Sequence, residues 1–492
     1  MAKFVLLAVL LALWGCGSRV TTALSRLKAC SAEDGPSGAY CGTYEVFEDR
    51  SAAEGRKIGL KIVLLPALDS DAATDPVFFL AGGPGQSATS LAYPLATFFS
   101  RVRRDRDIVL IDQRGAGKDN PLSCEDAWED EDEPRDPFDI AAGMAKLREC
   151  LEAFEGNPTL YTTPVAMDDL DEIRAWLGYE RINLYGGSYG TRAALVYMRQ
   201  HPESVRAVVL DGVAPTSMAI PLQMPRDSQR SLDKLVEACA NDPLCAQRFP
   251  NFEKQLQAVL EKLDRERPKV RLRHPRTGEP VEWTLSAEAI RLPLMGALYS
   301  PWESSLVPLV IEESAKGNYE PLLALALAKE GSAGEMSQGM FYSIMCSEDN
   351  PLLKESDAEA ASAGTFMGSS LLSTRWKPCE FWPKAAVPRE YYEPVSSDAP
   401  VLILSGDLDP VTPPSWGEAV SKSLPHSRHL IAAAAGHGVL SNGCAMRLIE
   451  QFFQTADASA LDATCLDNIE RPPFFIQPSG PRSAPSSGGS DD

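Results

Sequence analysis

An apolar run that ends in two glycines and a serine, directly before a helix-like segment, is the feature that most constrains this chain. The run reads RINLYGGS and continues as YGTRAALVYMRQH, so that Ser188 stands between Gly186 and Gly190 in a Gly-x-Ser-x-Gly pattern. A strand that turns sharply into a helix needs small neighbours, because the backbone passes closely on both sides of the turn. We therefore expect a strand, a tight turn that exposes the Ser188 hydroxyl, and a helix that begins at once.

Strand-like segments that alternate with helix-like segments extend this layout along the chain. The strand candidates are 57–68, 76–85, 106–115, 181–188, 205–215, 399–410 and 428–438. Such alternation predicts an α/β fold in which a mostly parallel sheet carries helices on both faces. The length of 492 residues leaves room for a further, inserted unit.

The pattern divides the chain into five segments. Residues 216–395 are mainly helical in pattern, apart from a hairpin-like stretch at 269–285, and we predict that they form a helical cap. The α/β core then has a first part and a C-terminal part, with a signal peptide before them and a disordered, Pro/Gly/Ser-rich tail after them. These four segments are 1–16 for the signal, 30–215 and 396–475 for the core, and 477–492 for the tail.

The N-terminus has the layout of a secretory signal. Lys3 precedes an apolar run that is too short to span a membrane, and small residues follow the run. The four residues that end at Cys16 resemble a bacterial lipobox, in which the cysteine becomes the lipidated first residue. Trp14 departs from the small residue that is usual there, so an ordinary signal cleaved nearby is the alternative. Both interpretations predict export, to the periplasm, to the cell envelope as a lipoprotein, or to the medium.

Cysteine usage also favours export. The chain has 11 cysteines, and those other than Cys16 form pairs of sequence neighbours: Cys30/Cys41, Cys124/Cys150, Cys239/Cys245, Cys346/Cys379 and Cys444/Cys465. Five disulfides in an oxidising compartment are the natural interpretation, although sequence alone does not fix their connectivity. No Cys-x-x-Cys motif or Cys/His cluster is present, so no metal site is predicted. The formal net charge of −21 argues against nucleic-acid binding, because a phosphate backbone requires a basic surface.

A serine hydroxyl is a weak nucleophile, so Ser188 would need a base and an acid that orients the base. Among the five histidines only His437 follows a late strand candidate in a glycine-flanked loop, and it is the candidate base. Asp409, in a proline-containing turn after the preceding strand, is the candidate acid. Asp407 is expected to be a helper or a turn residue, and Asp211 is the alternative acid. The order Ser…Asp…His is that of α/β-hydrolases.

Acyl transfer from such a serine also needs donors for an oxyanion. The backbone N–H of Tyr189, directly after the nucleophile, is one candidate. The second donor is expected from the glycine turn AGGPGQS (81–87), with Gly83 as first choice and Gly82 as second. The Gly83–Pro84 bond is a candidate cis peptide, because a glycine-proline turn beside a ligand is a plausible place for one.

Five motifs occur in order along the chain: Gly82-Gly83-Pro84-Gly85, Asp112-Gln113-Arg114-Gly115, Gly186-Gly187-Ser188-Tyr189-Gly190-Thr191, Asp409-Pro410-Val411-Thr412-Pro413 and Gly436-His437-Gly438. Together they resemble the prolyl/tripeptidyl aminopeptidase family of α/β-hydrolases, and most closely its secreted tripeptidyl-aminopeptidase branch. The resemblance covers about residues 40–470. It implies an α/β-hydrolase fold with Ser188 as nucleophile, His437 as base and Asp409 as orienting acid.

The same resemblance implies two further points. Asp112 and Arg114 would form a structural pair that braces the oxyanion loop, without a catalytic role. Ala81 stands where prolyl aminopeptidases usually carry histidine, which weakens a strict proline-iminopeptidase assignment and favours the broader branch.

A peptidase that trims N-termini must bind a free ammonium group, and carboxylates near the mouth of the pocket would do this. Candidates within the predicted cap are Glu348, Asp349 and Glu303, and the alternative for each is a solvated surface acid. An apolar wall of the pocket, or otherwise the core of the cap, is expected to contain Trp302, Phe341 and Tyr342.

These residues predict a secreted serine hydrolase, and the resemblance implies an aminopeptidase that acts through an acyl-enzyme. The expected partners are peptide substrates with a free N-terminus, and no metal or cofactor is expected. The main alternative is an esterase or lipase-type carboxylic ester hydrolase, because fold and triad do not decide between amide and ester bonds. Acyl transfer or a purely binding role is a lesser alternative. Epoxide hydrolases and haloalkane dehalogenases of this fold normally have aspartate where Ser188 stands, which argues against both.

Overall fold

Nine strands form one sheet in the part of the chain that the structure describes, in the order β1-β2-β3-β5-β4-β6-β7-β10-β11. The computed structural model describes residues 22–124, 139–274, 277–327, 336–370 and 375–481. Neighbouring strands are parallel from β5 to β11, and β1, β2 and β3 add an antiparallel edge. The strands are β1 (Lys28–Ala29), β2 (Tyr40–Phe47), β3 (Lys57–Leu65), β4 (Val77–Leu80), β5 (Ile108–Ile111), β6 (Ile182–Gly187), β7 (Val205–Asp211), β10 (Val401–Gly406) and β11 (Ser427–Ala432). The predicted mostly parallel α/β sheet is confirmed.

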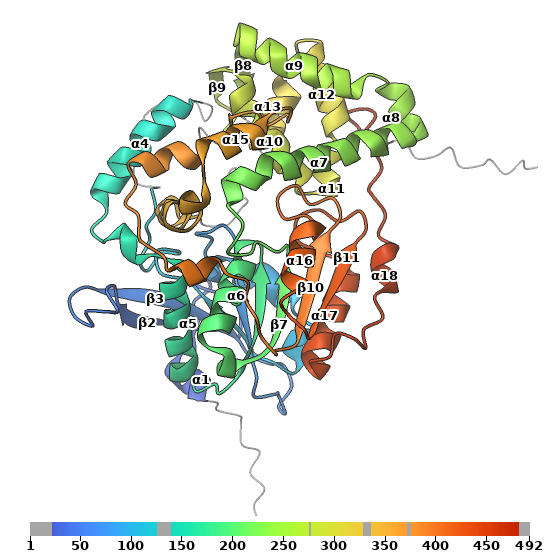
Figure 1. Cartoon of the computed structure of the whole chain (residues 1–492). Helices are drawn as coiled ribbons and strands as arrows, with labels where there is room; N and C mark the ends of the chain where they lie inside the picture. Colours follow the sequence, from blue (N-terminus) through green and yellow to red (C-terminus); the bar gives the residue numbers. More distant parts are fainter. Residues whose placement is uncertain (1–21, 125–138, 275–276, 328–335, 371–374, 482–492) are drawn as a thin grey trace, which may run out of the picture.

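Strand β4 illustrates why the sequence runs are apolar without alternation, since all four of its residues are buried. Parallel strands are covered on both faces, so both sets of side chains must be apolar. Phe78 and Leu80 contribute to one core and Val77 and Phe79 to the other. The first core packs on α5 (Thr163–Leu177) and α6 (Tyr189–Gln200), which are labelled in Figure 1. The second core packs on α2 (Ala92–Phe98) and α17 (Gly443–Thr455).

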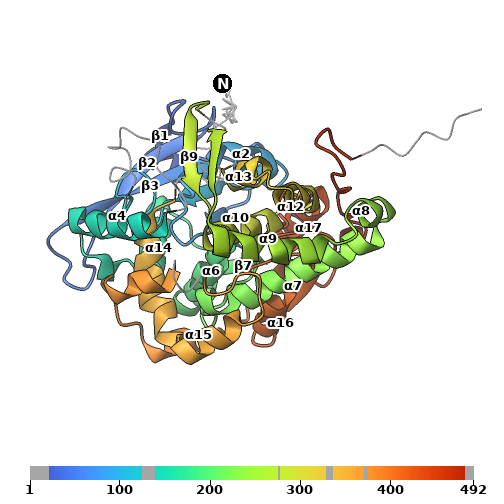
Figure 2. The same ribbon diagram turned by 90° about the horizontal axis from the view of Figure 1, so that it is seen from above.

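The segment between β7 and β10 builds a separate hydrophobic core, to which Leu235, Leu263 and Leu294 contribute from three different helices. Figure 1 shows these helices stacked at one end of the sheet, and Figure 2 shows them spread over that end. The helices of this cap are α7 (Ile220–Asn241), α8 (Pro243–Arg248), α9 (Phe252–Glu266), α10 (Ala287–Leu298), α11 (Pro301–Ser304), α12 (Val307–Ala315), α13 (Glu320–Leu327), α14 (Gln338–Ile344) and α15 (Glu355–Ser362). The expected hairpin is formed by β8 (Lys269–Arg273) and β9 (Pro280–Thr284). The remaining helices are α1 (Thr22–Arg26), α4 (Ile140–Ala153), α16 (Pro414–Ser421) and α18 (Thr464–Asp467).

Disulfides join all five predicted pairs among the described residues: Cys30–Cys41, Cys124–Cys150, Cys239–Cys245, Cys346–Cys379 and Cys444–Cys465. Because disulfides persist in oxidising compartments, they indicate an extracytoplasmic location. The predicted signal at 1–16 lies outside the described residues. The tail was predicted to be disordered from 477, yet residues 477–481 are placed, with a bridge between Gln477 and Gly480. No helix in the described ranges has the length and apolar character needed to cross a membrane.

Polar contacts between buried side chains help to fasten the cap to the α/β body, as two examples show. Arg192 of α6, which is completely buried, donates to Asp349 of the cap over 2.7 Å. The indole N–H of Trp416 in α16 donates to Asp227 of α7 over 3.0 Å. Burial raises the pKa of Asp227 to about 6, because the charged carboxylate loses water there.

Asp227→Asn is expected to raise the melting temperature near pH 7.5 and to raise it less near pH 4.5, where only part of the destabilisation is present. The folded chain holds a proton on Asp227 that the unfolded chain releases between the ordinary pKa of 3.8 and about 6. Stability therefore falls as pH rises through this window, and asparagine removes the cost while it keeps an acceptor for Trp416. Thermal melts at both pH values measure the effect, with the exposed Asp233→Asn on the same helix as control. An equal gain at both pH values would contradict the assignment.

Candidate active site

Ser188 occupies the turn between β6 and α6, with φ 55° and ψ −124°. A positive φ is strained for a residue other than glycine and persists only where the surroundings enforce it. The N–H of Ser188 donates to the carbonyl of Asp211 at the end of β7 over 2.9 Å. A Cβ atom on Gly190 would lie 2.1 Å from the carbonyl oxygen of Leu80, and one on Gly186 would lie 2.3 Å from that of Gly190. The predicted strand, turn and helix are confirmed, and both glycines are required by backbone contact.

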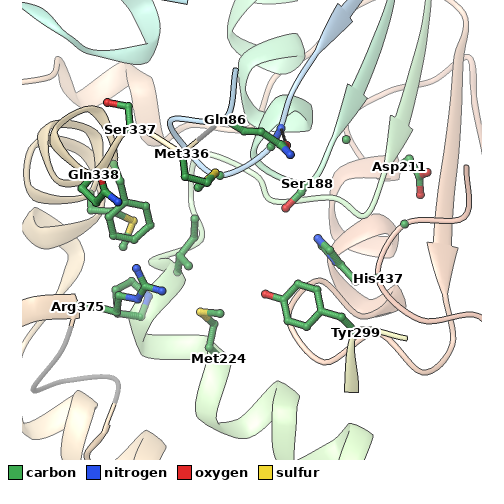
Figure 3. Close-up of a pocket in the computed structure, with 18 of the residues that line it drawn as sticks. Gln86, Ser188, Asp211, Met224, Tyr299, Met336, Ser337, Gln338, Arg375 and His437 are labelled. Carbon is green, nitrogen blue, oxygen red and sulfur yellow. Dashed lines mark hydrogen bonds between the residues drawn. The ribbon is translucent and has the colours of Figure 1, made fainter. Parts of the chain in front are cut away.

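His437 and Asp409 follow the last two strands of the sheet, and Nδ1 of His437 lies 2.8 Å from Oδ2 of Asp409. The Asp409 side chain is fully buried, whereas that of His437 is 14% exposed. Figure 3 shows the His437 ring and the Ser188 hydroxyl pointing toward one another. Burial acts to raise the pKa of Asp409, but the charge and hydrogen bond of His437 and the N–H groups of Val411 and Thr412 hold it below its ordinary value. The structure thus brings the three predicted residues together.

Thr412 is a member of this group that the sequence reasoning missed. Its hydroxyl donates to Oδ2 of Asp409 over 2.7 Å and lies 3.0 Å from Nδ1 of His437. Its backbone N–H donates to Oδ1 of Asp409 over 2.8 Å. Its position in the sequence could have revealed this role, because a threonine three residues after an aspartate can fold back onto the carboxylate.

The two other aspartates considered for the acid have different roles. Asp211 accepts the Tyr185 hydroxyl over 2.6 Å and the backbone N–H groups of Val439 and Leu440, which follow His437. It therefore holds the histidine loop, and its burial raises the pKa of its carboxyl group. Asp407 instead pairs with two cations of α7, Arg230 and Lys234. Asp407 lies in the turn that directly follows β10, in agreement with its expected place as a turn residue.

The histidine loop is also fixed from the cap side by Tyr299. The carbonyl of Tyr299 accepts the N–H of His437 over 2.9 Å, and the two rings are 4.8 Å apart in an edge arrangement. This contact was not expected from the sequence, because Tyr299 lies at the end of a cap helix with no motif around it.

The glycine turn after β4 passes beside the serine, since a Cβ on Gly82 would lie 3.3 Å from that of Ser188. The N–H of Gly82 donates to Oε1 of Gln86 over 3.2 Å. Gly83, with φ 106°, is therefore the better candidate donor of the two, as expected. Tyr189 begins α6, so its N–H has no acceptor within the helix. The Gly83–Pro84 peptide is cis, which confirms that expectation.

Asp112 braces this turn, because it accepts the Ser87 hydroxyl over 2.9 Å and both the N–H and the hydroxyl of Thr89. The expected pairing of Asp112 with Arg114 is wrong. Arg114 instead makes two hydrogen bonds to Asp169 of α5, over 2.7 and 3.0 Å. The resemblance implied this pair, but the backbone after β5 directs Asp112 to Ser87 and Thr89 and directs Arg114 to α5.

A cavity of about 630 Å³ opens at Ser188 and His437, within the size range of ligand sites. One side belongs to the α/β body, and the other comes from the cap segments (Figure 3). The cap side is lined by Ile220, Pro221, Met224, Tyr299, Met336, Ser337, Gln338, Phe341, Tyr342, Met345 and Arg375. The cap also holds the glycine turn after β4, since the N–H of Ser337 donates to the carbonyl of Gly85 over 2.9 Å. Across the described ranges, no group of three His, Cys, Asp or Glu side chains could hold a metal ion.

Glu348 and Asp349 do not line the cavity, and the prediction that they bind a substrate ammonium is wrong. Both are completely buried. Glu348 accepts the N–H and hydroxyl of Thr163 over 2.6 and 2.8 Å, and also the hydroxyl of Tyr391. Burial raises the pKa of both carboxyl groups, and the nearby Arg192 opposes the rise. They join the cap to the body.

The remaining cap candidates divide between the cavity and the surface. Glu303, in the short helix α11, is absent from the described cavity lining, so its predicted role is not supported. Its neighbour Trp302 is 65% exposed and lies in neither the pocket nor the cap core. Phe341 and Tyr342 do line the cavity.

Comparisons with known proteins agree with this geometry. A family model described as "alpha/beta hydrolase fold" matches residues 75–300, and one described as "TAP-like protein" matches residues 364–465. The chain is an α/β-hydrolase of the TAP-like family. The resemblance inferred from the motifs is thereby confirmed, and the chain is a serine hydrolase of that family.

Three relatives extend the comparison. Serine protease Hip1 of Mycobacterium tuberculosis is 27% identical over 427 residues, which cover 79% of this chain and 80% of that protein. The tripeptidyl aminopeptidase of Streptomyces coelicolor is 25% identical over 474 residues, with 87% and 83% covered. The proline iminopeptidase of Neisseria gonorrhoeae is 33% identical over only 138 residues, with 28% and 32% covered.

Thr412→Val is expected to lower kcat/KM about tenfold, because a buried carboxylate loses a donor that helps to keep it charged and oriented toward His437. Steady-state kinetics with one chromogenic ester and one fluorogenic peptide measure the loss. Thr412→Ser keeps the hydroxyl and should retain most of the activity. If the valine variant were as active as the native chain, the proposed role of Thr412 in orienting Asp409 would be wrong.

Asp349→Ala is expected to lower the free energy of unfolding by about 3–5 kcal/mol, because Arg192 is left charged and buried without its partner. KM at a temperature where the variant is folded should stay near the native value. Urea unfolding and kinetics measure the two quantities, and Glu282→Ala, which breaks an exposed pair with Arg271, is the control that should change little. Unchanged stability with a raised KM for free-amino peptides would restore the ammonium-binding role.

Proposed function

We propose that this chain is a serine peptidase that releases short fragments from peptide N-termini through an acyl-enzyme on Ser188. The proposal rests chiefly on the hydrogen bond between His437 and Asp409 beside the strained serine turn. Two relatives over most of the chain are named as a serine protease and a tripeptidyl aminopeptidase, which favours amide substrates over esters.

The acylation step follows from this geometry. The Ser188 oxygen attacks the substrate carbonyl while Nε2 of His437 takes the hydroxyl proton. Asp409 accepts the hydrogen bond from Nδ1–H and stabilises the imidazolium that forms, with Thr412 and the local N–H groups keeping the carboxylate ionised. The carbonyl oxygen becomes an oxyanion, for which the N–H groups of Gly83 and Tyr189 are the proposed donors.

Breakdown of this intermediate returns the proton. His437 donates it to the leaving amine, the carbon–nitrogen bond breaks, and the acyl group stays on Ser188. A water molecule then attacks the ester with His437 again as base, which releases the acid and restores the serine. His437 thus carries each proton, first from Ser188 to the leaving amine and then from water to the Ser188 oxygen.

Selectivity for N-termini is the finer part of the proposal. It is supported by the relatives' names and by a cavity of about 630 Å³ beneath a cap, which fits a short peptide better than a long chain. None of the three acids predicted to bind the ammonium lines the cavity in the described part of the chain.

The location proposal has two parts. Five disulfides favour an oxidising compartment. The N-terminal segment with Cys16 favours a signal peptide and a lipid anchor at the cell envelope, with periplasmic or extracellular release as the alternatives. Mass spectrometry of the mature N-terminus would distinguish a diacylglycerol-modified cysteine from simple cleavage.

Ser188→Ala is expected to lower kcat by about 10⁴-fold or more and to leave the melting temperature within a few degrees of the native value. Fluorogenic assays of the native chain and of this variant measure the loss, with the exposed Ser356→Ala as control. Native turnover in Ser188→Ala would overturn the proposed triad.

A matched substrate set tests the peptidase proposal. It comprises a fluorogenic tripeptide with a free amino terminus, its N-acetylated twin and a short-chain ester. Cleavage of the free peptide alone supports an aminopeptidase. Equal cleavage of both peptides supports a peptidase without N-terminal selection, and turnover of the ester alone supports an esterase.

A further inference from the structure

The cavity at Ser188 contains one unusual cation. Arg375 is the only lysine or arginine among its described lining residues, and Asp211 is the only carboxylate. The Asp211 side chain is already engaged by Tyr185, Val439 and Leu440. No described acid in the cavity is therefore free to neutralise Arg375.

Arg375 differs from the other arginines that lie near the site. Arg114 and Arg192 are fully buried, and each has a carboxylate partner within 2.7 Å. Arg375 is half-buried, its guanidinium carbon lies 4.6 Å from the centre of the Phe341 ring, and it forms no ion pair with any described residue. Stacking on an aromatic face holds a guanidinium in place but leaves its N–H donors without acceptors.

The position of Arg375 gives these donors a function. Figure 3 shows Arg375 and Gln338 on one side of the cavity and Ser188 and His437 on the other, with Met224 and Met336 between them. A substrate held at Ser188 whose chain crosses the cavity brings its far groups to the guanidinium. Much of the wall there is apolar, so an ion pair formed in this place is little screened by water.

A planar guanidinium with an apolar surround matches a carboxylate, which can accept two parallel N–H bonds. It disfavours a second cation, because like charges in a partly desolvated site repel. We infer that Arg375 is a specificity residue that binds a carboxylate of the substrate, so that the site selects acidic peptides. This inference rests on the proposed function insofar as the cavity is the substrate site.

Two kinds of carboxylate share this chemistry. One is the side chain of an acidic residue on the acyl side of the cleaved bond, and the other is the C-terminal carboxylate of a short leaving peptide. Arg375, held against the Phe341 ring, would bind either carboxylate, and Gln338 lies in the same lining as a further donor. The experiment therefore carries one arm for each.

The acyl-side arm uses fluorogenic tripeptides with glutamate or glutamine at each position in turn. The leaving-side arm uses hexapeptides with a free C-terminal acid or a C-terminal amide, and the products are measured by chromatography. For one of the two arms, the native chain is expected to cleave the acid about 10- to 100-fold faster, as kcat/KM, than its neutral twin. A ratio near one in both arms would overturn the inference.

Three substitutions assign that preference to Arg375. Arg375→Met should reduce the acid-to-neutral ratio of kcat/KM by about tenfold or more, Arg375→Lys should retain part of it, and Arg375→Glu should invert it toward lysine-containing peptides. Arg271→Met, on the exposed hairpin, is the matched control. A ratio that survives in folded Arg375→Met, checked by its thermal melt, would also overturn the inference.

A pair of esters separates failure of this inference from failure of the peptidase proposal. The pair is 4-nitrophenyl hydrogen adipate, which carries a free carboxylate, and methyl 4-nitrophenyl adipate, which is neutral. If the charged ester is preferred in an Arg375-dependent way but no peptide is cleaved, the carboxylate-binding role of Arg375 is supported and the peptidase proposal is contradicted. If peptides are cleaved but no substrate pair shows a preference for the acid, the peptidase proposal is supported and the carboxylate-binding role of Arg375 is contradicted.

Discussion

The backbone turn at Ser188 is the constraint on which the rest of the site depends. The ends of β4 and β6 and the start of α6 approach so closely that Gly186 and Gly190 have no room for a side chain. The N–H bond from Ser188 to the end of β7 and the packed α6 hold the serine at a positive φ. Because parallel strands present their carboxyl ends at one edge, the loops with Asp409 and His437 reach the same place.

The cap covers the cavity and also contacts the loops that carry the proposed catalytic residues. Tyr299 accepts a backbone hydrogen bond from His437, and Ser337 donates one to the glycine turn after β4 at Gly85. The buried pair of Arg192 and Asp349 joins the cap directly to α6, the helix that begins after Ser188. Substitutions in the cap can therefore change both the shape of the cavity and the catalytic geometry.

Several features followed from the sequence because each depends on residues close together in the chain. The serine turn, the cis glycine-proline bond and the disulfide pairs are local. His437 and Asp409 were predictable because strand ends in a parallel sheet converge. The burial of Glu348 and Asp349 was not predictable in this way. Their charge suited a role at the mouth of a pocket, but the residues that bind them, Thr163 and Arg192, lie more than 150 residues away in the sequence.

The sequence by itself determined the strand–turn–helix at the serine, the order of the three proposed catalytic residues and the alternation that produces the sheet. Each of these is encoded by short patterns whose physical cause is local sterics or burial on both faces of a strand. Only the tertiary structure decided which cap side chains reach the cavity. That outcome depends on how the cap segments pack: the same packing buries Glu348 and Asp349 against Arg192 and leaves Arg375 in the lining of the cavity.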